Sequence, residues 1–169
     1  MNKFSINATN LRWINGKKDD AKDLCLHGHA VANIGNEVYE YDATVSATAL
    51  YLLKSITENH IIHNDIQILP CCGFSMWLKN DGTEDVFICG CPNGVDWSII
   101  HEKGIIKLIT ETGSETLIMP DEYKKEVFKF ADLIEDFYKN STPKILPKDD
   151  LDREGYIAFW KEWHRRRNS

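Results

Sequence analysis

The chain has 169 residues, 43% of them hydrophobic, which fits a single domain (residues 1–169) with a hydrophobic core that needs neither metal nor disulfide. No run of about 18 apolar residues occurs, so a membrane-spanning helix is excluded. The net charge is −6, made up of +3 in residues 161–169 and −9 in the rest, and such an acidic body argues against nucleic acid as a ligand.

The first 41 residues predict four strand segments, of which the last two form a hairpin. Strand-like runs occupy residues 4–7 and 11–14, followed by a polar turn at 15–20. Residues 24–31 alternate apolar and polar side chains, with Leu24, Leu26 and Val31 as anchors. A turn at residues 35–36 then leads into a returning strand at residues 37–41.

The middle of the chain predicts one helix and then a strand meander. Apolar residues at helical spacing predict a helix over residues 43–57, capped by Asp42 or Thr44. Residues 59–69 are interpreted as a linker or short strand. Short runs joined by Gly-containing turns then predict antiparallel strands at residues 73–78, 84–89, 95–101, 105–110 and 115–119.

Two helices are expected after Pro120. The first carries a stripe of Tyr123, Val127, Phe130, Ile134 and Phe137. The second begins near Asp149 or Asp150, contains Gly155 early, and places Tyr156, Trp160 and Trp163 on one face. The fold class is therefore α+β: a mostly antiparallel sheet of about six to eight strands, with one early helix and two C-terminal helices.

Five cysteines raise the question of a metal site. They are expected to be thiols, because their number is odd and the chain is expected to be cytosolic. The i, i+2 pairs Cys89/Cys91 and His27/His29 could form a four-ligand zinc site on neighbouring strands, but the spacing differs from the usual knuckle. Cysteine is also a common buried hydrophobe. We therefore assign no metal ligand and no cofactor. The cysteines are Cys25, Cys71, Cys72, Cys89 and Cys91.

No catalytic signature is present, so we predict that the protein is not an enzyme. The zinc deaminase pattern fails because His29 is followed by Ala-Val and Pro70 by Cys-Cys-Gly-Phe. There is no G-x-S-x-G elbow and no G-x-x-x-x-G-K-[ST] phosphate loop. We expect a cytoplasmic location, since residues 1–5 lack the apolar region of a signal peptide.

Turns rich in acidic residues are the candidate partner contacts. The turn at residues 92–97 combines a carboxylate with a Trp, which suits an interface hot spot. In the alternative interpretation, Asp96 caps its own turn and Trp97 fills the core. The terminal arginines 165–167 could contact RNA, cap the helix or pair with the domain's own carboxylates. The candidate partner-binding residues are Asp81, Glu84, Asp85, Asp96 and Trp97.

The C-terminal half resembles small bacterial immunity proteins of polymorphic and contact-dependent toxin systems. The resemblance is carried by Gly-Cys-Pro-Asn-Gly-Val-Asp-Trp at 90–97, Asp-Glu-Tyr-Lys-Lys at 121–125, Phe-Tyr-Lys-Asn at 137–140 and residues 155–164. It implies a non-catalytic binder of one cognate toxin C-terminal domain in the cytosol. Such toxins are often nucleases with basic surfaces, which an acidic protein would match. The pattern defines no specific family and transfers no functional residue.

Three functions are therefore considered. The first is an immunity protein that neutralises a toxin domain, binding neither nucleic acid nor membrane. The second is a small metal-binding enzyme or regulator that uses the Cys and His pairs. The third is a subunit of a larger assembly that docks through the aromatic C-terminal helix. We expect deletion of residues 155–169 to make the protein insoluble, because several buried aromatic side chains are lost, whereas a soluble truncation would support an interface.

Overall fold

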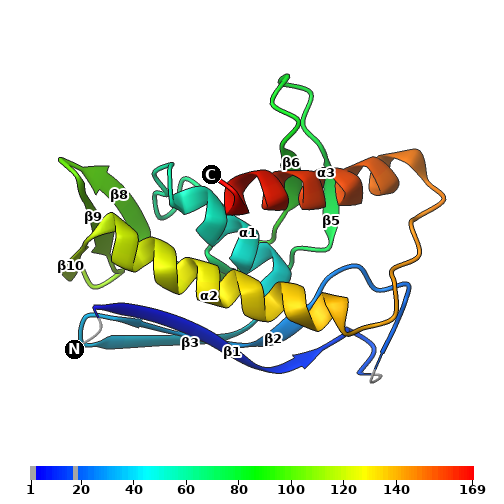
Figure 1. Ribbon diagram of the computed structural model, residues 1–169. Helices are drawn as coiled ribbons and strands as arrows, with labels where there is room; N and C mark the ends of the chain where they lie inside the picture. Colours follow the sequence, from blue (N-terminus) through cyan, green and yellow to red (C-terminus); the bar gives the residue numbers. More distant parts are fainter. Residues whose placement is uncertain (1–2, 17–18) are drawn as a thin grey trace.

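The computed structural model describes residues 3–16 and 19–169, so part of the turn expected at residues 15–20 lies outside the described residues. Within these ranges the chain forms three helices and ten strands, all paired antiparallel (Figure 1). The α+β class is confirmed, with one early helix and two C-terminal helices. The strands are divided among four small sheets rather than collected in one.

The N-terminal sheet has the order β1-β2-β3, formed by β1 (Phe4–Arg12), β2 (His27–Ile34) and β3 (Glu37–Ala43). The strand expected at residues 24–31 begins three residues later, because Leu26 precedes the ladder and is buried in the core. Ala30 and Ala32 turn towards the helices, and their small side chains allow close approach of the layer above. Gly35 adopts the positive φ of 59° that the tight β2–β3 turn requires.

Three helices pack above this sheet. Helix α1 (Val45–Ser55) begins after Thr44, whose side chain makes no capping bond and donates instead to the carbonyl of Cys71. Helix α2 (Pro120–Lys139) lies along the sheet, and α3 (Asp150–Arg167) lies on the far side of α1 and α2 (Figure 1). Asp149 caps α3 by accepting hydrogen bonds from the N–H groups of Leu151 and Asp152.

The strands predicted in the middle of the chain are present, but they belong to three separate sheets. Strands β8 (Ser98–Glu102), β9 (Ile105–Ile109) and β10 (Glu115–Ile118) form a three-stranded sheet. The short strand β4 (Leu69–Pro70) pairs with β7 (Gly94–Val95), and β5 (Ser75–Leu78) pairs with β6 (Val86–Cys89). The strand expected at residues 95–101 is thus split into β7 and β8 on either side of Asp96 and Trp97.

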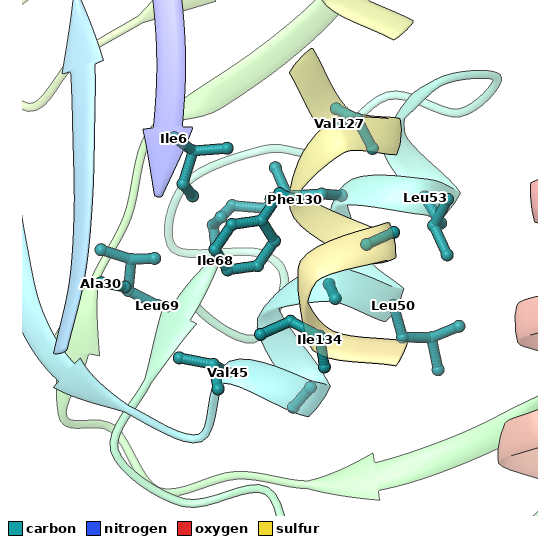
Figure 2. Packing of buried hydrophobic residues seen from close by; sticks show 14 of the residues in the cluster. Ile6, Ala30, Val45, Leu50, Leu53, Ile68, Leu69, Val127, Phe130 and Ile134 are labelled. Atoms are coloured by element: carbon teal, nitrogen blue, oxygen red, sulfur yellow. The ribbon is translucent and has the colours of Figure 1, made fainter. Parts of the chain in front are cut away.

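The core lies where α1 and α2 meet the N-terminal sheet. Figure 2 shows Phe130 and Ile134 of α2 facing Ile6 of β1 and Val45 of α1. Ile68, just before β4, and Leu69, the first residue of β4, belong to the same cluster. None of the helices in the described ranges combines the length and the apolar character needed to cross a lipid bilayer.

Helix α3 packs directly against β5 at Gly155. A Cβ added there would lie 2.5 Å from the Met76 carbonyl carbon and 2.7 Å from the Trp77 Cα. Only glycine permits this approach. The β5–β6 hairpin is held by this contact at its base, and its turn projects beyond α3 into solvent (Figure 1).

Candidate functional site

The turn of the β5–β6 hairpin carries two of the predicted acidic contacts in exposed positions. Asp81 accepts hydrogen bonds from the Thr83 hydroxyl and N–H, which lower the pKa of its carboxyl group. Glu84 has a positive φ of 57°, and its carboxylate lies 3.9 Å from the Lys161 ammonium. Both residues are exposed, so their carboxylates remain accessible to a partner.

Asp85 has a structural role instead. Its carboxylate pairs with Arg165 and, at 3.4 Å, with Arg166. Arg166 is buried and also binds Glu162 at 2.7 Å, whose other oxygen accepts the N–H of Val86 at 2.8 Å. This network attaches the hairpin to the end of α3. The Asp85 carboxylate is therefore engaged by arginines of the same protein and is not offered to a partner.

The terminal arginines therefore pair with the protein's own carboxylates, as one of the sequence interpretations proposed. Arg167 contacts Asp132 of α2 at 3.0 Å, and Arg166 also reaches Glu58 at 2.8 Å. Because each guanidinium already meets a carboxylate, the cluster offers RNA little free positive charge.

Asp96 and Trp97 lie in the interior, which corrects their assignment as partner contacts. Asp96 is 4% exposed and accepts hydrogen bonds from His60 Nε2 at 2.7 Å and from the Ile68 N–H at 3.1 Å. Trp97 is fully buried beside the rings of Phe4 and Tyr39. The alternative in which Trp97 fills the core is confirmed, although Asp96 caps distant groups rather than its own turn.

An aromatic pair that the sequence analysis did not single out faces outward from the hairpin. Trp77 and Phe87 are directly opposite on β5 and β6, and their rings stack with centroids 4.9 Å apart. The alternate residues Met76 and Ile88 point inward, on the side covered by α3. Phe87 remains 38% exposed and Trp77 is half-buried. Residues Trp77, Asp81, Glu84 and Phe87 are called the hairpin surface below.

A cavity of about 260 Å³ adjoins the hairpin surface and shares Phe87 with it. Its walls come from the end of α1, the segment around His60, and β6. The Tyr51 hydroxyl lies in this wall, buried and without a hydrogen-bond partner among the described residues. Burial raises the pKa of Tyr51, so the hydroxyl stays protonated. Asp65 also lines the cavity and is exposed.

A second, larger hollow of about 730 Å³ is an open groove between β1 and α2. Its polar lining consists of surface lysines and aspartates of α2, including Lys125, Lys129 and Asp136. Three lysines and three aspartates line the groove, so their charges balance. It therefore favours no particular ligand.

Three of the five cysteines meet near the base of the hairpin. The sulfur atoms of Cys71, Cys72 and Cys91 lie within 4.8 Å of one another. Hydrogen bonding to Cys91 raises the pKa of Cys72 to about 12, whereas a backbone hydrogen bond from Asn93 lowers the pKa of Cys91. The histidine pair considered as co-ligands is not part of this group: His29 contacts Glu40 and Asp42 on β3.

Comparisons of the chain with protein-family models, with curated proteins and with solved structures found no match.

Proposed function

We propose that this protein is an immunity protein: a non-catalytic cytosolic binder that neutralises a toxin domain carrying a basic surface. The observation that carries the proposal is the hairpin surface, in which a stacked aromatic pair and two exposed carboxylates are presented on a projecting hairpin. Neither nucleic acid nor membrane is the proposed partner.

The aromatic pair supplies the binding energy in this proposal. Trp and Tyr or Phe anchors dominate interface hot spots because they bury a large apolar area with few rotatable bonds. Trp77 and Phe87 already stack on each other, so little side-chain freedom remains to be lost on binding. The network from Asp85 to Arg166 holds the hairpin in place before the partner arrives.

The acidic residues steer a basic partner towards the binding surface in this proposal. Residues 1–160 carry a charge of −9, and Asp81 and Glu84 extend that negative charge to the tip of the hairpin. A partner with a basic surface is attracted to such a surface before contact, which raises the association rate. Asp85 does not contribute, because its charge is matched by two arginines.

The adjoining cavity offers a place for one partner side chain. Asp65 adds an exposed carboxylate to its lining. A partner side chain could enter this cavity with its aliphatic part against Phe87 and donate to Asp65. Lys54 and Lys79 line the cavity together with Glu58 and Asp65, so the cavity adds room for a side chain and no preference for a basic one.

The experiment is co-expression with the C-terminal domain of the large protein encoded beside this gene, scoring growth rescue and co-purification. The double variant Trp77→Ser/Phe87→Ser should weaken the complex by at least about 30-fold in Kd, as expected when a hot spot worth about 2 kcal/mol is removed. Leu117→Ser is the matched control, since Leu117 is an exposed apolar residue on β10 of a different sheet.

A second pair of variants tests the charge. Asp81→Lys/Glu84→Lys should slow association and reduce its dependence on salt, with a smaller effect on dissociation. Glu111→Lys, an exposed carboxylate in the turn after β9, is the control. Absence of rescue by the wild-type protein would overturn the immunity function. Rescue and affinity unchanged in both double variants would remove the hairpin surface from the interface.

A further inference from the structure

The three-cysteine cluster, Cys71, Cys72 and Cys91, joins two loops that are distant in sequence. Cys71 and Cys72 follow β4, and Cys91 precedes β7. The Cys71 and Cys72 sulfur atoms are 3.8 Å apart, and all three sulfurs lie within 4.8 Å of one another. Cys89 is exposed on β6 and does not belong to the cluster.

Backbone contacts fix the two loops against each other. Strands β4 and β7 pair through Leu69 with Val95 and Pro70 with Gly94. The Cys71 N–H extends this pairing by donating to the Asn93 carbonyl at 3.1 Å. A Cβ on Gly94 would lie 2.5 Å from the Leu69 carbonyl oxygen, so this approach requires glycine. The sulfur positions are thus set by a rigid backbone frame.

The spacing of the sulfurs matches a thiolate metal site. A Zn–S bond is about 2.3 Å long, so two thiolates on one tetrahedral zinc ion are about 3.8 Å apart. The Cys71–Cys72 separation already has this value, and Cys91 needs only a small side-chain adjustment to join them. We infer that the three-cysteine cluster binds a thiophilic metal ion, Zn²⁺, through three thiolates with the fourth coordination position open.

Surrounding groups support the ligands. The Thr44 hydroxyl donates a hydrogen bond to the Cys71 carbonyl oxygen at 3.3 Å, which fixes the backbone beside this sulfur. Contacts around the ligands of this kind help to orient them for a metal ion. The three cysteines are half-buried, which leaves the fourth position reachable by water or by a partner's side chain.

A disulfide fits the cluster less well than a metal. Any one S–S bond has a length of about 2.05 Å and joins two sulfurs only, leaving the third thiol alone. Three sulfurs around one centre are the arrangement that a single soft cation satisfies, because thiolates select ions such as Zn²⁺. The inference concerns the isolated protein and is independent of the proposed partner.

The test is metal binding by the full chain, purified without a histidine tag and reduced before measurement. Zn²⁺ is titrated against a chromophoric chelator, and Co²⁺ is used as a spectroscopic substitute whose thiolate charge-transfer absorption reports sulfur ligation. We expect one equivalent of metal per chain. Cys72→Ser and Cys91→Ser should each weaken binding by at least about 100-fold.

Cys89→Ser is the matched control, since Cys89 is an exposed cysteine two positions from Cys91 and outside the cluster. It should bind metal as the wild type does. Circular dichroism of each variant verifies that the fold is kept. Less than about a tenth of an equivalent of bound zinc in the reduced protein, or equal losses in the Cys89 and Cys91 variants, would overturn the inference. Isolation of a disulfide within the cluster with no zinc binding after its reduction would do the same.

Discussion

Replacing Gly155 with Ala tests how α3 holds the hairpin. Gly155 is where α3 crosses β5, and the nearest atoms to an added Cβ belong to the backbone of Met76 and Trp77. Backbone atoms cannot rotate away as a side chain can. The 2.5 Å separation from the Met76 carbonyl carbon must grow to 3.4 Å for ordinary contact, and the Met76 carbonyl oxygen is nearer still, so α3 or β5 must move by at least about 0.9 Å.

The size of the effect follows from two opposing contributions. In a free helix, Gly→Ala stabilises by about 1 kcal/mol. Forcing a methyl group into a packed interface costs about 1–3 kcal/mol, and more when backbone must shift. A displacement of α3 also loosens the buried side chains of Tyr156, Phe159 and Trp163. We expect a net loss of about 2 kcal/mol or more in the free energy of unfolding.

Urea unfolding followed by tryptophan fluorescence measures this loss. Glu154→Ala is the control, because Glu154 is exposed in the same helical turn, and its change should stay within about 0.5 kcal/mol. A Gly155→Ala protein as stable as the wild type, or more stable, would show that helix propensity outweighs the contact. The close approach of α3 to β5 would then be refuted.

Two further predictions concern buried groups. Asp96→Ala leaves the Ile68 N–H and His60 without their buried acceptor, so it should lower the free energy of unfolding in urea by about 3 kcal/mol. Asp96→Asn keeps an acceptor oxygen and should lower it less. Equal losses in the two variants would contradict this role of Asp96. Burial raises the pKa of Cys25 to about 12, so iodoacetamide at pH 8 should leave it unmodified in the native protein while labelling exposed Cys89, as read by peptide mass spectrometry. Labelling of both at similar rates would contradict that burial.

Much of the fold was predictable because its signals are local. The apolar stripe of α2 at Tyr123, Val127, Phe130 and Ile134 is buried as the helical spacing indicated. The Gly-containing turns lie close to their predicted positions. They could be predicted because glycine adopts the positive φ that such turns need, as Gly35 does. These features depend on residues near one another in the chain.

The division into four sheets could not be read in the same way. Residues 95–101 look like one strand, but Asp96 turns inward to bind His60 and the Ile68 N–H, which interrupts it. The two-residue strands β4 and β7 are too short to show any periodicity. Both features depend on contacts between residues that are 24 or more positions apart in the chain.

The candidate sites were only partly predictable for the same reason. Asp81 and Glu84 were identified because turn residues are usually exposed, but nothing near Asp85 in sequence indicates that Arg165 and Arg166 will neutralise it. The sequence pairs Cys91 with Cys89, whereas the β4–β7 ladder pairs it with Cys71 and Cys72. The outward face of Trp77 and Phe87 could have been found from strand alternation opposite the buried Met76 and Ile88.

The most direct test of the central proposal is co-expression of this protein with the toxin domain encoded beside its gene. Growth rescue by the wild type, a one-to-one complex on purification, and at least about 30-fold weaker binding by Trp77→Ser/Phe87→Ser are the results we predict. Failure of the wild-type protein both to restore growth and to co-purify with the toxin domain would contradict the proposed function.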